Sequence, residues 1–261
     1  MTKHAFAAIA LALAASQAQA IGGLILLGSP PEQEAKLSIG PSVAAYPEAP
    51  GSDKTTVLPL LGVDYYHPNG FFFSTDIGLG WNLSHQKEWQ YGARLWPVFG
   101  RSDDTSRSLG LQDIGNRLGY GLYANYAPWE FLQLQSSLLA GSGNNGKGVQ
   151  FEIGSTLGAR LASNFVMGLM LGATWANADH LRSYYGVSPE ESAAGSLPAY
   201  APGADWSDVN YGLVGSLRFN EQWKLSGQWL AGRLMGDAKN SPVVRDRTQN
   251  TFSLTLWYQF K

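Results

Sequence analysis

The chain has 261 residues, a formal net charge of −2 at pH 7, 15% charged residues, 31 glycines and no cysteine. Ordinary soluble domains contain about 25% charged residues and about 7% glycine, so this composition is poor in charge and rich in glycine. The near-neutral charge provides no basic stripe that could neutralise phosphates, which argues against nucleic-acid binding. The lack of cysteine excludes disulfides, thiolate metal sites and a cysteine nucleophile.

Residues 1–20 have the pattern of a cleaved secretory signal peptide. Lys3 and His4 form a short polar start, residues 5–15 are apolar, and Ala18-Gln19-Ala20 is an A-x-A cleavage site. The alternative is a transmembrane anchor, but the apolar run is shorter than the roughly 20 residues that a spanning helix needs. We therefore expect export and one mature domain at residues 21–261.

Segments of alternating apolar and polar residues dominate the mature chain. At its end, Phe252, Leu254, Leu256, Tyr258 and Phe260 share one parity, which predicts a strand with two different faces. No stretch approaches 18 uninterrupted apolar residues, so membrane-spanning helices are not expected. Eleven segments show the alternation, in chain order: 37–45, 57–65, 71–81, 89–99, 118–126, 132–140, 149–160, 165–175, 209–219, 223–231 and 252–260.

Most of these segments have 9 to 11 residues, the length at which a tilted strand crosses a membrane. Short turns alternate with long loops near 101–115, 177–206 and 236–249, and aromatic residues lie at strand ends. These features predict an all-β, antiparallel, up-and-down transmembrane β-barrel in the outer membrane. A soluble barrel or sandwich is the alternative, because it would also alternate.

A barrel with both termini in the periplasm needs an even number of strands. We expect twelve strands, with ten as the alternative. The twelfth strand would lie at 21–30 or 178–187, unless one weak segment is a loop. If every short turn is assigned to the periplasm, the strand directions around residues 68–88 differ according to whether the strands are counted from the N-terminus or from the C-terminus.

Two loop motifs resemble a known family. The first contains Tyr185-Gly186-Val187-Ser188, Glu191-Ser192 and Leu197-Pro198-x-Tyr200, and the second runs from Arg233-Leu234 through Gly236-Asp237-Ala238 to Ser241-Pro242-Val243. Together they resemble the MipA/OmpV family of outer-membrane proteins, and the resemblance covers essentially all of the mature chain. The resemblance implies a barrel that brings a lytic murein transglycosylase together with a murein synthase. Lys261 after Phe260 departs from the family's usual aromatic C-terminus.

Three groups of residues are candidates for function. Charged residues on the polar parity suggest either a lumen that conducts small anions or a plugged interior in which charges pair. The loop at 177–206 suggests either a partner-contact surface or a folded-in cap, and the second family motif favours a structural loop. The lumen candidates are Asp64, Asp76, Arg94, Arg117, Glu152, Arg160 and Arg218, with Lys224 beside them; the contact candidates are Tyr184, Tyr185, Glu191, Tyr200 and Trp206; the motif candidates are Arg233, Asp237, Ser241 and Pro242.

Catalysis is not expected. The mature chain has only His67, His85 and His180, and no nucleophile motif or metal-ligand spacing accompanies them, although His180 could pair with a serine of its own long loop. No cofactor site is expected either. We therefore predict a non-enzymatic, monomeric barrel surrounded by outer-membrane lipid that acts as a scaffold for murein-synthesising machinery. The alternative is an anion-leaning channel for small solutes.

Overall fold

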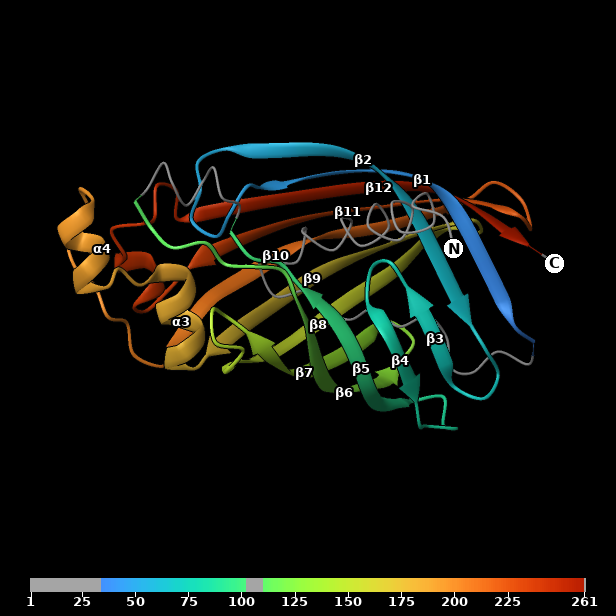
Figure 1. The fold of residues 1–261 in the computed structure, drawn as a ribbon. Coiled ribbons are helices and arrows are strands. Elements are labelled where there is room, and N and C mark those ends of the chain that lie inside the picture. Colours follow the sequence, from blue (N-terminus) through green and yellow to red (C-terminus); the bar gives the residue numbers. More distant parts are fainter. Residues whose placement is uncertain (1–33, 102–109, 261) are drawn as a thin grey trace, which may run out of the picture.

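The computed structural model describes residues 34–101 and 110–260. The expected signal peptide and the possible strand at 21–30 lie outside these residues. Within them, the chain forms a closed antiparallel barrel in which each strand pairs with its neighbours in sequence and β1 pairs with β12 (Figure 1). The strands are β1 (Lys36–Pro47), β2 (Thr55–Tyr66), β3 (Phe71–Ser74), β4 (Gly78–Asn82), β5 (Trp89–Val98), β6 (Arg117–Trp129), β7 (Leu132–Ser142), β8 (Gly148–Ala162), β9 (Phe165–Ala176), β10 (Asp205–Arg218), β11 (Trp223–Leu234) and β12 (Thr248–Phe260).

The barrel has the expected twelve strands, but the extra strand has a different origin from the one predicted. The expected single strand at 71–81 is a short hairpin, in which β3 and β4 are joined by a turn at 75–77. Gly78 follows this turn with φ +91°, a conformation that favours glycine. The segment 178–187, the other place considered for a strand, begins with a helix, α3 (Ala178–Tyr185).

The hairpin also explains the inconsistent orientation. Strands β3 and β4 are antiparallel, so the chain leaves one end of the barrel in β3 and returns to the same end in β4. The turns at 67–70 and 83–88 therefore both lie at the end of the barrel that holds the start of β1 and the end of β12. All the connections at this end are short. The long connections lie at the opposite end, together with α3, α4 (Pro189–Ala194) and η2 (Ala238–Asn240) (Figure 1).

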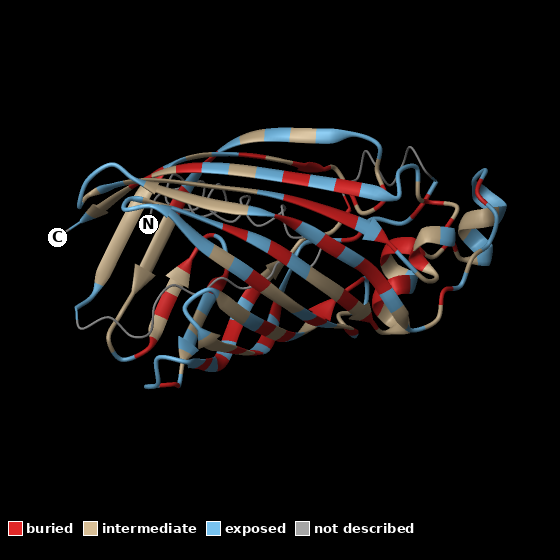
Figure 2. Cartoon of the chain, turned by 180° about the vertical axis from the view of Figure 1, so that it is seen from behind, coloured by how far each residue is buried: buried red, intermediate tan, exposed pale blue. Residues whose placement is uncertain are grey.

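The two faces of the wall differ as the alternation predicts. In β5, Trp89, Tyr91 and Leu95 are 41%, 46% and 41% exposed, whereas the intervening Gln90 and Arg94 are 7% and 3% exposed. Figure 2 shows the same alternation of buried and exposed residues along neighbouring strands. The outer surface is therefore an apolar belt, and the barrel is of the outer-membrane type. Among residues 34–101 and 110–260, no helix is long and apolar enough to span a membrane.

Candidate functional site

Helix α3 closes the long-loop end of the barrel. Asn177 begins the helix, because its side chain accepts a hydrogen bond from the backbone N–H of His180. The buried face of α3 carries Leu181, Tyr184 and Tyr185, which pack with residues of neighbouring strands and loops. This buried cluster consists of Ile114, Ala176, Leu181, Tyr184, Tyr185, Leu234 and Ala238. The helix is thus held by the ends of β9 and β11 and by two other loops.

Helix α4 is fixed by a capping box. Ser188 accepts a hydrogen bond from the N–H of Glu191, and Oε2 of Glu191 accepts one from the N–H of Ser188. The other carboxylate oxygen of Glu191 accepts a hydrogen bond of 2.8 Å from the N–H of Gln112. Glu191 therefore ties α4 to the loop between β5 and β6.

The predicted partner-contact residues do not form one exposed surface. Tyr184 and Tyr185 are buried, and the hydroxyl of Tyr184 donates to the carbonyl of Phe99 at 2.8 Å. The hydroxyl of Tyr200 donates to the carbonyl of Asp237 at 2.8 Å. Trp206 is 42% exposed and lies in β10 beside Trp175 of β9. The arrangement favours the folded-in cap over the contact surface.

The second family motif, at 233–243, stabilises the cap formed by residues 177–206 through hydrogen bonds and packing. Oδ2 of Asp237 accepts a hydrogen bond from the N–H of Gly203, and Oγ of Ser241 donates to the carbonyl of Tyr185 at 2.5 Å. Pro242 precedes Val243, whose buried side chain packs with Val187 and other residues of the first motif. Arg233 is exposed at the end of β11. The structural interpretation of the motif fits these contacts.

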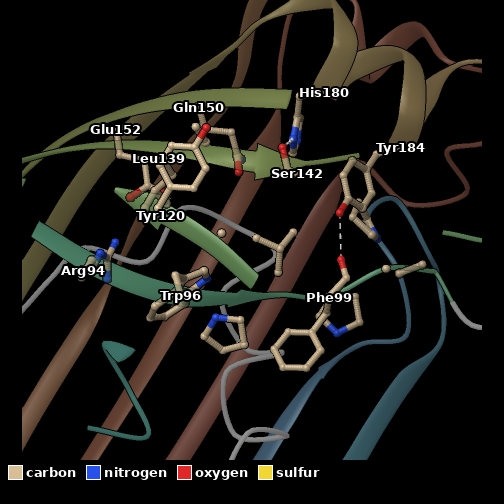
Figure 3. A pocket seen from close by; sticks show the side chains of 18 of the residues that line it. Arg94, Trp96, Phe99, Tyr120, Leu139, Ser142, Gln150, Glu152, His180 and Tyr184 are labelled. Carbon is tan, nitrogen blue, oxygen red and sulfur yellow. Dashed lines mark hydrogen bonds between the residues drawn. The ribbon is translucent and has the colours of Figure 1, made fainter. Parts of the chain in front are cut away.

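A cavity of about 70 Å³ lies beneath the cap, which is room for several water molecules. It lies between the β1–β2 loop, the far end of β5, and α3 (Figure 3). Polar side chains from four elements reach it: Arg94 from β5, Ser142 from β7, Gln150 and Glu152 from β8, and His180 from α3. Sequence reasoning missed Ser142 and Gln150. Gln150 lies on the polar parity of the predicted strand at 149–160, which could have indicated it. Ser142 follows the predicted strand at 132–140 on the outward parity and is buried because the register of β7 shifts between Ala140 and Ser142.

Arg94 and Glu152 are the buried charged residues of this cavity, and the half-buried Glu48 also lines it. Arg94 is stacked on the ring of Trp96, 4.6 Å from its centroid, and donates to the carbonyl of Ile77 at 3.1 Å and to Oγ of Ser137 at 3.2 Å. Ser137 is the cross-strand partner of Glu152. Nε of Arg94 and Oε2 of Glu152 are buried and have no hydrogen-bond partner among the described residues. Buried polar atoms are normally paired, so this site is suited to a small polar group.

The other predicted lumen charges lie elsewhere. Asp64, Asp76 and Lys224 interact electrostatically with one another, and Lys224 lies over the ring of Trp257. Arg117 donates to the carbonyl of Asn144 at the long-loop end. Arg160 and Arg218 are exposed at the short-turn end, where Arg160 donates to the carbonyl of Ser163. Of the seven predicted residues, the structure brings only Arg94 and Glu152 to the cavity beneath the cap.

Burial changes the acidity of side chains on α3. It lowers the pKa of His180 from its ordinary value of 6.5 to about 4. Burial also raises the pKa of Tyr184 to about 12 and that of Tyr185 well above its usual range. All three side chains are therefore neutral at pH 7, as their packing inside the cap requires.

His180 forms the serine pair that the sequence suggested, but with a serine of β7. Its Nδ1 lies 2.8 Å from Oγ of Ser142. In a catalytic triad, a third group orients the histidine through its other ring nitrogen. No such group bonds to His180 among the described residues, and no group of three or more His, Asp or Glu residues in this part of the chain could hold a metal ion. The pair acts as a structural contact between α3 and the wall.

Comparison with known proteins identifies the family. The model of the family "MltA-interacting protein MipA" matches residues 39–260. The chain belongs to this family. Two proteins named MltA-interacting protein, from Escherichia coli (strain K12) and Shigella flexneri, are each 26% identical to it over 235 residues, which cover 87% of this chain and 91% of theirs.

Solved structures with a similar fold are more distant. An outer-membrane channel from Pseudomonas putida F1 is 13% identical, with a TM-score of 0.45, over 92% of this chain and 98% of its own. The NanC porin is 9% identical, with a TM-score of 0.41, over 85% of this chain and 98% of its own. The MipA family therefore provides the basis for interpreting function, because a fold alone does not imply one.

Proposed function

We propose that this member of the MipA family is a non-enzymatic scaffold that holds a lytic murein transglycosylase and a murein synthase at the periplasmic face of the outer membrane. Family membership is the observation that carries the proposal, because the relatives from Escherichia coli and Shigella flexneri are named as interacting proteins. Export through cleavage after residue 20 forms part of the same proposal.

The contacts of the cap indicate where the partner would bind. In outer-membrane barrels the short turns face the periplasm and the long loops face the outside. The capped end would then face away from murein, and its tyrosines are already used in internal contacts. The short turns carry exposed apolar side chains instead: Leu83, Phe131 and Phe219 are 57%, 54% and 56% exposed. We assign the partner contact to this end.

A binding assay with the barrel in lipid nanodiscs tests this assignment. The immobilised barrel is titrated with a purified lytic murein transglycosylase. A variant with Leu83→Ser and Lys87→Glu in the turn at 83–88 should bind at least tenfold more weakly, since interface energy is concentrated in a few side chains. The matched control is Trp206→Ala at the capped end, which should bind like the parent chain. Equal binding by the turn variant, or loss confined to the control, would contradict the assignment.

A channel for small solutes is the second candidate. Its support is the set of buried polar atoms on the inner wall that have no partner among the described residues, including those of Gln135, Glu152 and Thr251. Such atoms favour a hydrated lumen over a dry one. Under this alternative the cap must move before solute passes.

A further inference from the structure

One row of residues on the inner face of the wall crosses the neighbouring strands β8 to β12. Cross-strand pairing joins Thr156 of β8 to Met170 of β9, and Met170 to Gly212 of β10. The row continues from Gly212 to Leu230 of β11 and from Leu230 to Thr251 of β12. Each member is next to an exposed, lipid-facing residue of its own strand, in the same order Leu157, Leu171, Tyr211, Trp229 and Phe252. Because side chains alternate across a strand, this set of residues, which we call the inner row, faces the lumen.

The inner row is buried although a barrel of twelve strands is wider than the roughly eight strands whose interior side chains alone can fill. Met170 and Leu230 are only 1% and 4% exposed, and neither belongs to the apolar clusters formed by the described residues. The Oγ atoms of Thr156 and Thr251 are also buried, without a hydrogen-bond partner in this part of the chain. Water would satisfy the two hydroxyls but would leave the two apolar side chains uncovered. The inner row therefore suits an occupant that presents apolar side chains together with hydrogen-bonding groups, as a peptide segment does.

Residues 21–28 have this composition and lie within reach of the inner row. Their sequence is Ile-Gly-Gly-Leu-Ile-Leu-Leu-Gly, which contains no polar or charged side chain. Strand β1 begins at Lys36 at the short-turn end, and the twelve residues from Leu24 to Lys36 can span up to about 40 Å when extended. Met170 lies five residues from the start of β9 at the same end, which is about 17 Å along the strand. The chain before β1 is thus long enough to enter the lumen from the short-turn end and cover the inner row.

The link between this segment and β1 is complementary in charge to the rim that it would cross. Residues 29–35 contain two carboxylates, Glu32 and Glu34, and no basic residue. Arg160 and Arg218 lie on the inner parity and are exposed at the short-turn end. Opposite charges at this rim favour passage of the link, although each exposed pair contributes little energy.

We propose that residues 21–28 dock inside the lumen against the inner row. Their leucine and isoleucine side chains cover Met170 and Leu230, and their backbone carbonyls accept hydrogen bonds from the two threonine hydroxyls. The wall closes with twelve strands without this segment, so the segment forms an inner layer on the β8–β12 side and not a further wall strand. The proposal rests on the proposed cleavage after residue 20, which makes residue 21 the start of the exported chain, and it is independent of the partner contact.

Disulfide cross-linking in isolated outer membranes tests this docking. The chain has no cysteine, so an introduced pair provides the only two thiols. Leu230→Cys is combined in turn with four substitutions in the segment: Leu24→Cys, Ile25→Cys, Leu26→Cys and Leu27→Cys. The matched control uses Trp229→Cys in place of Leu230→Cys, because Trp229 is the neighbouring residue of β11 and faces lipid. Since a disulfide needs Cβ atoms about 4 Å apart, at least one position in 24–27 should cross-link to position 230 and none should cross-link to position 229.

Alkylation by a water-soluble maleimide tests whether these residues are what covers the inner row. Leu230→Cys is alkylated in the parent background and in a background in which serine replaces every residue of 24–27, which leaves the cleavage site intact. The serine background should react at least tenfold faster, because a polar segment no longer packs on the inner row. Trp229→Cys should react at the same rate in both backgrounds. Heat-modifiable migration in gels verifies that each variant is folded.

Two results would overturn the docking. One is the absence of any cross-link to position 230. The other is equal alkylation of Leu230→Cys in the two backgrounds: equally fast reaction would show water at the inner row, and equally slow reaction would show that lipid, detergent or the wall itself covers it. The intact mass of the exported chain tests the cleavage separately, since a chain that retains residues 1–20 would contradict the cleavage while the cross-links still show where residues 24–27 lie.

Discussion

Nδ1 of His180 lies 2.8 Å from Oγ of Ser142, which connects the first helix of the cap to the last residue of β7. The imidazole also packs against Tyr184, with 4.7 Å between ring centroids. Both partners of the hydrogen bond are buried, with exposed fractions of 8% for His180 and 3% for Ser142. The docking of α3 therefore depends on an imidazole that stays neutral.

This dependence predicts that acid loosens the cap. The pKa of His180 is about 4 when α3 is docked and near 6.5 when the ring is in water. The undocked state thus binds more protons between these values, and docking loses about 1.4 kcal/mol per pH unit as pH falls below 6.5, up to about 3 kcal/mol near pH 4. Hydrogen–deuterium exchange of residues 178–185, corrected for intrinsic rates, should accelerate from pH 7 to pH 5.

His180→Gln is the control for this prediction. Glutamine retains polar atoms near Ser142 but does not titrate. The other ionisable side chains that line this cavity are present in both proteins: Glu48, Arg94, Tyr120, Glu152 and Tyr184. At pH 7, exchange of residues 178–185 should be faster in the variant than in the parent chain. Between pH 7 and pH 5, the variant's exchange rate should increase much less than that of the parent chain. The same acid response in the variant and the parent chain would assign it to another group.

The turn inside the barrel wall gives a second prediction. Gly78 has φ +91°, and a Cβ atom there would lie 2.2 Å from the carbonyl oxygen of Leu95. Gly78→Ala should therefore destabilise the barrel by at least about 2 kcal/mol. Gly158→Ala is the matched control, because its Cβ would meet its nearest atom at 3.9 Å. Urea unfolding, followed by gel migration of the folded form, should leave the control within about 0.5 kcal/mol of the parent chain.

This turn also shows where sequence reasoning reached its limit. Alternation identified the wall correctly because the inner and outer faces of a strand differ in polarity, as Gln90 and Tyr91 do. It could not divide residues 71–81 into two strands, because alternation continues in phase from Phe71 to Trp81 and turn residues 75–77 do not include glycine or proline. The positive φ of Gly78 is a backbone property that a strand glycine does not reveal.

The cap shows a different limit. Exposed aromatic residues in a long loop and aromatic residues that fold into a barrel mouth have the same composition, so the sequence left both interpretations open for Tyr184 and Tyr185. Their burial is decided by the hydrogen bonds of Phe99 and Ser241, which are 85 and 56 residues away from them in sequence. Likewise, the inward parity of Arg160 could not reveal that its side chain is exposed near the end of β8 and bonds to the turn at Ser163. Depth in the lumen follows from barrel geometry and not from parity.

The second family motif gives a third prediction. Ser241→Ala removes the hydrogen bond to the carbonyl of Tyr185 and the acceptor for the N–H of Val243, so two backbone groups in the cap lose a partner. The cap should become less stable by about 1 to 3 kcal/mol. Thermolysin cleavage within 186–204 should accelerate at least fivefold, because the cleavage rate is proportional to the fraction of molecules in which the cap is undocked. Arg233→Gln, an exposed position of the same motif, should leave the cleavage rate unchanged; a similar rate increase there would contradict a specific role for Ser241.

The cap also makes conductance a test of the second candidate function. Asp205 pairs with Ala176, so residues 178–204 can be replaced by a short Gly-Ser-Gly linker between β9 and β10. The parent chain should be silent in planar bilayers because α3 closes the lumen, whereas the shortened chain should show stable openings.

Within the shortened chain, Arg94→Glu should shift ion selectivity towards cations, and Arg160→Glu should change the selectivity less because Arg160 lies exposed at a strand end. Steady conductance by the parent chain would show that the cap does not close the barrel, and silence of a folded, shortened chain would show that the inner wall itself blocks the lumen.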